Sequence, residues 1–239
     1  MVICRRLILI RGFMELGILE WINANLHGCN FINHLIKFIT YLGEDGIAWA
    51  LVGVVLLFFK KTRKSGLIVL AGFASVVVVN HFILKNIINR PRPFTESQDL
   101  VNFIKSIGMQ LPTSSSFPSG HTTISITSAV ILTMCFGKRG AWSFIPAVLI
   151  SLSRIFLCVH YPTDVLGGAV EGIILGVLVV LVGRVILDRL ERWWINRKEK
   201  KQNLVNASEN NNTIQEDKSS NEENSEKSQK DSLTENGEK

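Results

Sequence analysis

The stretch DVLGGAVEGIILGVLVVLVGRVIL, residues 164–187, decides the fold of this chain. It is apolar over a length close to the roughly 20 residues that an α-helix needs to cross a hydrocarbon core. Because backbone amides in that core have no water to bind, the stretch is expected to be helical. Further apolar stretches occupy about 28–43, which is the weakest, 46–59, which is the shortest, 65–84, 121–137 and 140–159. We therefore expect an all-α, polytopic membrane helix bundle of about six transmembrane helices.

The two ends of the chain differ from this transmembrane domain, which is expected to cover residues 28–195. Residues 1–27 form an N-terminal cytoplasmic or interfacial segment, in which Met14–Leu26 is amphipathic and either lies in the headgroup layer or crosses the membrane. Residues 196–239 are rich in Asn, Glu, Lys and Ser and contain few large apolar residues. Such a composition buries too little surface to fold, so it predicts a disordered polar tail.

Basic residues gather at three places between or after the apolar stretches. They lie at Lys60–Lys64, at Lys138 and Arg139, and from Arg184 to Lys198. The excess of Lys and Arg on the cytoplasmic side of membrane proteins places all three inside. Both termini are then expected in the cytoplasm, in a multi-pass protein of the cell membrane.

The spacing along each predicted helix places a second group of polar residues at the opposite face. Lys85 lies 21 residues after Lys64, which is about 31 Å along a helix and one hydrocarbon thickness. His121, His160 and Asp164 lie at similar distances from the basic sites. Residues far apart in the chain are therefore expected to meet in one layer at the outer face.

Three motifs carry these polar residues. They are Lys85-x6-Arg92-Pro93, Pro118-Ser119-Gly120-His121 and Ser153-Arg154-x5-His160-x3-Asp164. In their order and at every signature position they resemble the type 2 phosphatidic acid phosphatase superfamily, and the resemblance extends over about residues 30–187. The membrane branch of that superfamily consists of six-helix lipid phosphatases, including bacterial undecaprenyl-diphosphate and phosphatidylglycerophosphate phosphatases. The apolar stretches argue against its soluble branch, the vanadium haloperoxidases.

The resemblance implies three catalytic residues. His160 would attack phosphorus and form a phosphohistidine, while Asp164 would fix its tautomer and stabilise the resulting cation. His121 would protonate the leaving oxygen and then activate the water that hydrolyses the intermediate.

The resemblance also implies a set of phosphate-binding residues, in which fixed cations and a helix N-terminus hold the phosphoryl oxygens. The residues concerned are Lys85, Arg92, Ser119, Gly120 and Arg154. With the positive charge supplied by the protein, no metal or other cofactor is expected.

The resemblance thus predicts an enzyme that hydrolyses a lipid phosphate or diphosphate at the outer membrane face. Undecaprenyl diphosphate is the favoured substrate, and phosphatidate or phosphatidylglycerophosphate is the alternative. A lipid transporter is less favoured, because a transporter places its charges near the bilayer midplane. A non-catalytic lipid-binding protein is also less favoured, because it would not need both histidines and Asp164. Nothing in the sequence indicates a nucleic-acid ligand or an obligate protein partner.

Two features of the last apolar stretch lie outside these motifs. Gly168, Gly172 and Gly176 recur at every fourth position, which allows close packing of helices. Glu171 lies two turns beyond Asp164 on nearly the same face, and an ionisable group inside a span is a functional candidate. A packing role and a proton-path role for Glu171 both remain open.

Overall fold

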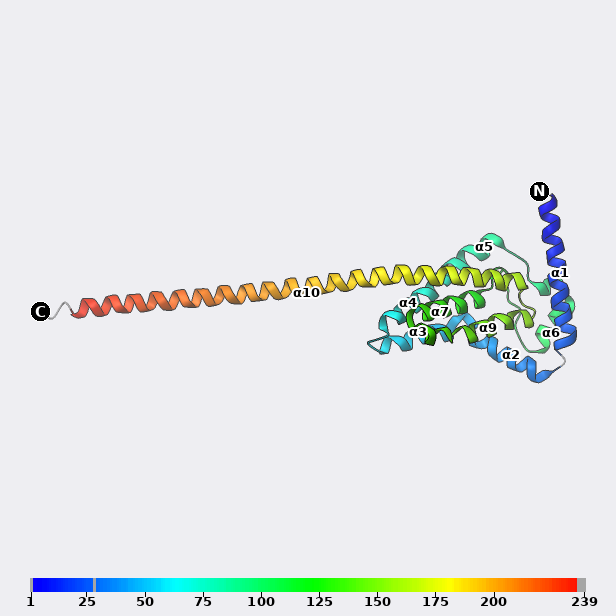
Figure 1. Cartoon of the computed structure of the whole chain (residues 1–239), viewed down its shortest axis with the longest axis horizontal. Helices are drawn as coiled ribbons and strands as arrows, with labels where there is room; N and C mark the ends of the chain where they lie inside the picture. The colour runs from blue at the N-terminus through cyan, green and yellow to red at the C-terminus, as the bar shows by residue number, and fades with distance from the viewer. Residues whose placement is uncertain (1, 28, 236–239) are drawn as a thin grey trace. The chain divides into compact units, whose positions relative to one another are not determined.

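The computed structural model describes residues 2–27 and 29–235, and the regular structure in these residues is helical (Figure 1). The chain divides into two compact units, Met1–Arg184 and Val185–Lys239. The elements are α1 (Val2–Leu26), α2 (Asn30–Leu42), η1 (Glu44–Gly46), α3 (Ile47–Phe58), α4 (Arg63–Val76), η2 (Val77–Leu84), α5 (Lys85–Ile88), η3 (Pro93–Thr95), α6 (Gln98–Ser106), α7 (Gly120–Phe136), α8 (Lys138–Ala141), α9 (Phe144–Phe156) and α10 (Pro162–Glu235).

Among the described residues, two helical segments are long and apolar enough to cross a membrane. One is Arg63–Thr95, which joins α4, the π-helix η2 and α5, and the other is Pro162–Asn203 within α10. The pair α2 and α3 makes a third candidate if it is counted as one span, and α7 is apolar but shorter. The chain is therefore an all-α protein with two or three candidate spans.

The pair α2 and α3 corrects one expectation from the sequence. Residues 28–43 and 46–59 were predicted to be two separate spans, whereas α2 and α3 continue in a similar direction with a bend of 47°. The break contains only the short turn η1, and Gly46 adopts φ +70, a left-handed conformation that favours glycine. A connection this short turns the chain without reversing it.

Helix α7 lies inside the first unit, and its residues from Thr122 to Leu132 are all buried. Helix α10 approaches it through the predicted glycine stripe. A Cβ atom at Gly168 would lie 2.7 Å from the backbone oxygen of Ser119, and one at Gly172 would lie 2.8 Å from that of Thr123. Only glycine permits this approach, so the packing role predicted for the stripe is confirmed.

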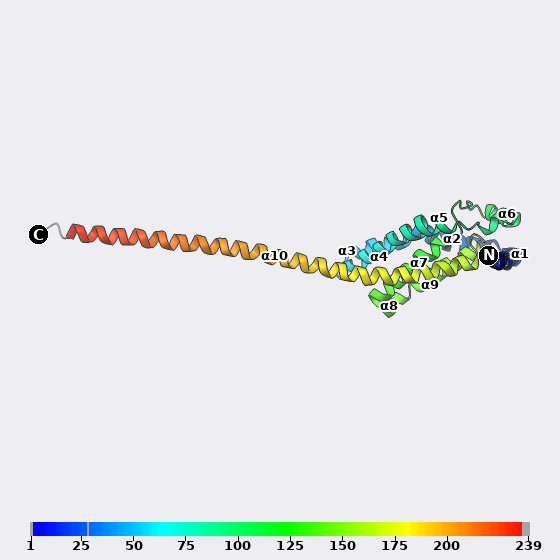
Figure 2. The same ribbon diagram turned by 90° about the horizontal axis from the view of Figure 1, so that it is seen from above.

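The two ends of the first unit carry different segments. The α3–α4 connection, with Lys60 and Lys61, lies at one end, and α1 and α6 lie at the other (Figures 1 and 2). The basic turn and the segment around α6 are thus separated by the length of the bundle.

The position of α1 is set by its packing against α6. Leu19 is fully buried and belongs to the same apolar cluster as Leu100, Phe103 and Ile104 of α6. The ring of His27 stacks on Phe103 with a centroid separation of 3.5 Å. Met14–Leu26 therefore lie at the end opposite the basic α3–α4 turn, because the apolar face of α1 packs against that of α6. Their predicted interfacial location stays a prediction.

The second unit contains the rest of α10. Its helical backbone continues to Glu235, although the composition after Val205 offers little apolar surface to bury. An isolated helix without a packed face is marginal in water, so we retain the description of a disordered C-terminal stretch that the composition gives. The prediction for residues 236–239 lies outside the described residues.

Candidate active site

A cavity of about 460 Å³ brings together residues from all three sequence motifs. It lies at the junction of η2, α7 and α9, and six of the eight predicted site residues line it: Lys85, Arg92, Gly120, His121, Arg154 and His160. The other two, Ser119 and Asp164, are fully buried behind its wall. Predicted site residues up to 75 positions apart in the sequence, Lys85 and His160, thus contribute to one space.

His160 and Asp164 lie side by side where α9 ends and α10 begins. The Nδ1 atom of His160 is 3.6 Å from Oδ2 of Asp164, and its Nε2 atom is 3.4 Å from Nη1 of Arg92. A guanidinium only donates hydrogen bonds, so Nε2 is the unprotonated nitrogen and Nδ1 carries the proton. This tautomer directs the lone pair of Nε2 into the cavity.

Asp164 is fixed by several donors besides the histidine. Its Oδ2 accepts hydrogen bonds from the Ser116 hydroxyl and, at 2.9 Å, from the backbone N–H of Tyr161. Its Oδ1 accepts one from Arg90 at 2.7 Å. A buried carboxylate with this many donors is held in its charged form and in one orientation.

Burial has the largest effect on His160 and lowers its pKa to about 3. Asp164 opposes this shift, whereas the cations Arg92 and Arg154 add to it. His160 is therefore a neutral imidazole near pH 7, which is the form that can act as a nucleophile.

The two arginines of the cavity wall are both buried but are held in different ways. Arg92 donates to the backbone oxygens of Ser114, at 2.7 Å, and Val159, at 3.0 Å. Arg154 donates to Thr40 at 2.6 Å through Nη1, and its Nε atom has no hydrogen-bond partner among the described residues. An unpaired N–H on a buried cation is a donor available to an anion.

The N-terminus of α7 opens into the same cavity at Gly120 and His121. The helix begins at Gly120, where a Cβ atom would lie 3.8 Å from Nζ of Lys85. The buried Nε2 of His121 has no partner among the described residues. Free amides at a helix start, a cation and an unpaired imidazole nitrogen together form a site suited to an anion.

Ser119 is placed differently from the expectation. Its backbone N–H donates to the backbone oxygen of Asp164 at 3.1 Å, and its hydroxyl accepts a hydrogen bond from Thr122 at 3.1 Å. The side chain is not among the residues that line the cavity. In this structure Ser119 joins α7 to the start of α10.

Several supporting residues lie outside the three sequence motifs. Arg90 bridges Asp164 and Glu15, and it donates to Oε2 of Glu15 at 2.6 Å. The Arg90-Pro91-Arg92-Pro93 pattern did indicate a role for Arg90. A residue before proline favours extended backbone, and alternate residues of an extended segment lie on the same face, so Arg90 is expected on the same side as Arg92. Ser116 and Thr40 gave no such signal, since their partners are 48 and 114 residues away.

Glu171, whose role the sequence left open, bonds to two other helices. Its Oε2 accepts hydrogen bonds from Asn80 at 2.8 Å and from Thr123 at 3.0 Å. Its Oε1 is buried without a partner among the described residues. Glu171 thus ties α10 to η2 and α7 immediately beside the cavity.

Comparisons with known proteins found one family model and several similar proteins that match this chain. A family model described as the PAP2 superfamily matches residues 65–186. The chain is similar to an undecaprenyl-diphosphatase of Sulfolobus acidocaldarius, with 34% identity over 145 residues that cover 59% of this chain and 66% of that protein. It is also similar to an undecaprenyl-diphosphatase of Bacillus subtilis, with 27% identity over 168 residues that cover 69% and 82% of the two chains.

Among solved structures, the crystal structure of a transmembrane PAP2-type phosphatidylglycerolphosphate phosphatase from Bacillus subtilis resembles the fold. The TM-score is 0.56 at 27% sequence identity, and the match covers 72% of this chain and 86% of that one.

Proposed function

The chain belongs to the PAP2 superfamily, and on that premise we propose that it is an integral-membrane phosphatase that hydrolyses undecaprenyl diphosphate at the outer membrane face. The observation that carries this proposal is the convergence of Lys85, Arg92, His121, Arg154 and His160 on one cavity. Three cations and two histidines around a helix N-terminus suit a phosphoryl group and its transfer.

The proposed reaction begins with the neutral imidazole of His160. Its Nε2 attacks the terminal phosphorus of the diphosphate, and the bond from that phosphorus to the bridging oxygen breaks. His121 gives a proton to the departing oxygen, so that the lipid leaves as a monophosphate. Asp164 stabilises the positive charge that develops on the His160 ring.

In the second step a water molecule attacks the phosphohistidine. His121, now without its proton, takes one from the water, and the bond between phosphorus and Nε2 breaks to release inorganic phosphate. Lys85, Arg92 and Arg154 hold the equatorial oxygens in both steps, where the charge on them is greatest. The amide of Gly120 adds a backbone donor at the start of α7.

The choice of lipid rests on the relatives. Two similar proteins are undecaprenyl-diphosphatases, which favours a polyprenyl diphosphate. The structural likeness to a phosphatidylglycerolphosphate phosphatase favours phosphatidylglycerophosphate as a second candidate, and phosphatidate is a related monophosphate.

An assay of the purified protein tests the proposal directly. We expect phosphate release to be fastest from undecaprenyl diphosphate when it is compared with phosphatidylglycerophosphate and phosphatidate at equal surface concentration. His160→Ala should reduce release to background while the protein stays folded, because the attacking nitrogen is gone. His34→Ala, on an exposed position of α2, is the matched control and should keep full activity. Near wild-type turnover by His160→Ala would exclude the proposed nucleophile.

A further inference from the structure

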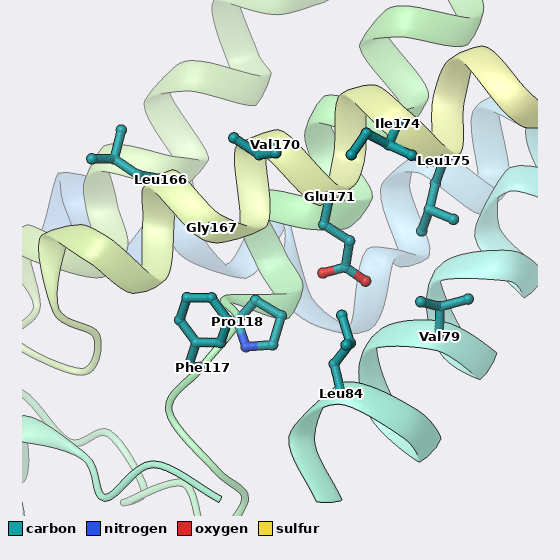
Figure 3. Close-up of a pocket in the computed structure, with 10 residues that line it drawn as sticks. All are labelled: Val79, Leu84, Phe117, Pro118, Leu166, Gly167, Val170, Glu171, Ile174 and Leu175. Atoms are coloured by element: carbon teal, nitrogen blue, oxygen red, sulfur yellow. The ribbon is translucent and has the colours of Figure 1, made fainter. Parts of the chain in front are cut away.

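Glu171 is an ionisable residue within the segment of α10 that is long and apolar enough to span a membrane. Its carboxylate points from α10 toward Leu84 at the end of η2, and the other side chains labelled around it are apolar (Figure 3). A charge in such surroundings is costly to bury, so an acidic residue there is expected to have a partner and a function. The reaction proposed above does not use this group.

Asn80 of η2 is the partner of Glu171 and also faces the catalytic cavity. Its Nδ2 atom donates to Oε2 of Glu171 at 2.8 Å and to Oγ1 of Thr123 at 3.1 Å, so both amide hydrogens are engaged. A carboxylate accepts hydrogen bonds and donates none, so it fixes which end of the Asn80 amide lies next to it. The carbonyl oxygen Oδ1 is therefore turned to the other side, where Asn80 lines the cavity.

The π-helix η2 aligns Asn80 with Lys85. The backbone N–H of Lys85 donates to the backbone oxygen of Asn80, five residues earlier. In an α-helix, side chains five positions apart would point about 140° away from each other, and a π-helical turn brings them nearer to one side. Oδ1 of Asn80 and Nζ of Lys85 accordingly lie 3.4 Å and 3.8 Å from the point that a Cβ atom on Gly120 would occupy. The two groups thus face the same space at the start of α7.

A carbonyl oxygen in this space is matched to a donor. It would repel the oxygens of a bound phosphoryl group, whereas the ammonium of Lys85 can donate to it. The same ammonium donates to the hydroxyl oxygen of Ser114 at 3.4 Å. Two acceptors from different segments would then determine where the Lys85 ammonium lies over Gly120.

We propose that Glu171 and Asn80 are positioning residues that hold the ammonium of Lys85 at the start of α7. The chain of contacts runs from the Glu171 carboxylate through the Asn80 amide to Lys85, and each acceptor in it faces a donor. This inference rests on the proposed function, because Lys85 acts there on the equatorial oxygens, whose charge is greatest in the transition state. A displaced Lys85 should therefore affect kcat more than KM.

Glu171→Gln tests the chain, because it keeps the size of the side chain and removes the charge that orients the Asn80 amide. We expect kcat for undecaprenyl diphosphate to fall at least fivefold, with KM changed less than twofold. Thr127→Val is the matched control, since the Thr127 hydroxyl also joins α7 to α10, through the backbone oxygen of Gly172 at 3.2 Å, and Thr127 does not line the cavity. It should keep kcat within twofold of the wild type. An equal loss of kcat in Thr127→Val and Glu171→Gln would overturn the inference, because helix packing alone would then explain the effect.

Removal of Lys85 separates positioning from the other roles of Glu171. In the Lys85→Ala background, Glu171→Gln should change kcat less than twofold, because the group that Glu171 positions is gone. A fall of the same size in both backgrounds would overturn the inference and assign Glu171 to a proton path or to helix packing. Asn80→Leu interrupts the same chain and is the second variant in case Glu171→Gln does not fold.

A binding measurement repeats this comparison without turnover. Orthovanadate resembles the phosphoryl group in its transition state, and the rise in melting temperature with its concentration gives its Kd. We expect Glu171→Gln to raise this Kd at least threefold when Lys85 is present and to leave it unchanged within the error in the Lys85→Ala background. Equal increases in both backgrounds would contradict the positioning role.

The two measurements also separate the inference from the proposed function. A wild type that binds orthovanadate and releases no phosphate from any lipid phosphate would overturn the proposed function, and the orthovanadate comparison would then decide the role of Glu171. A wild type that neither binds orthovanadate nor releases phosphate would overturn both.

Discussion

At the scale of the residue, the site depends on a histidine that is kept neutral by its surroundings. His160 is only 2% exposed, and its acidic neighbour Asp164 accepts hydrogen bonds from Ser116, Arg90 and the amide of Tyr161. The resemblance to the phosphatase superfamily implied the pairing of His160 with Asp164. It could not predict that donors from two distant segments share the carboxylate, because contacts of that kind are fixed by the tertiary fold.

The lowered pKa of His160 predicts how stability depends on pH. The ordinary pKa of histidine is 6.5, and burial lowers that of His160 to about 3. As the pH falls below 6.5 the unfolded chain binds a proton that the folded protein does not. Stability from this residue is thus complete above pH 6.5 and declines by about 1.4 kcal/mol per pH unit toward pH 3.

Thermal unfolding in detergent can measure this effect. The melting temperature of the wild type should fall relative to that of His160→Gln as the pH is lowered from 6.5 to 4, and the difference should be constant between pH 7 and 8.5. His34→Gln, at an exposed position, should give a curve parallel to the wild type. If His160→Gln also runs parallel to the wild type from pH 7 to pH 4, His160 is not buried in its neutral form.

At the scale of the element, the sequence predicted helices and their packing better than their connections. The predicted packing role of the glycine stripe of α10 was correct, because a spacing of four residues along one helix can be read directly from the sequence. The prediction that 28–43 and 46–59 are two separate spans was wrong. Two apolar stretches joined by a short turn have the same sequence pattern whether the chain reverses direction at the turn or only bends there. The packing of α1 against α6 was not predicted, because no motif in either segment indicates its partner. Only the burial of their apolar side chains against each other sets their relative position.

Arg90 connects α1 to the catalytic pair and carries an element-scale prediction. It reaches Glu15 of α1 and Asp164 of α10, and its side chain is 24% exposed. Arg90→Gln would leave Oδ1 of Asp164 without its charged partner, and loss of a hydrogen bond to a charged group costs about 1.5–3 kcal/mol. We expect kcat to fall at least tenfold, at about 1.4 kcal/mol per decade, with KM changed less than threefold.

Two further variants separate positioning of Asp164 from anchoring of α1. Arg90→Lys should recover part of kcat because it keeps the charge near Asp164. Glu15→Gln should lower the melting temperature with a smaller effect on kcat, since the contact between Arg90 and Asp164 is retained. A loss of kcat in Glu15→Gln as large as that in Arg90→Gln would mean that Arg90 acts through α1 alone.

At the scale of the whole molecule, the distribution of charge and the location of the site are linked. The cationic cavity and the basic α3–α4 turn belong to opposite ends of the first unit, and the positive-inside rule places the turn in the cytoplasm. The site is then expected to face outward, where a lipid diphosphate in the outer leaflet can reach it. The sequence predicted this separation because the distance along a membrane helix follows from residue count. It could not predict the side of Met14–Leu26, which depends on packing against α6.

Accessibility of single cysteines in intact cells tests the orientation of both segments together. In a background with the native cysteines replaced by alanine, Gln98→Cys at the start of α6 and Glu20→Cys on α1 should react with an impermeant thiol reagent from outside, because both positions are exposed at the site end of the unit. Lys61→Cys in the α3–α4 turn should react only after permeabilisation. Labelling of Gln98→Cys only after permeabilisation would reverse the orientation and exclude an outward-facing phosphatase. If Glu20→Cys instead followed Lys61→Cys while Gln98→Cys reacted from outside, the packing of α1 on α6 would be the part in error, because residues buried against each other cannot lie on opposite sides of a membrane.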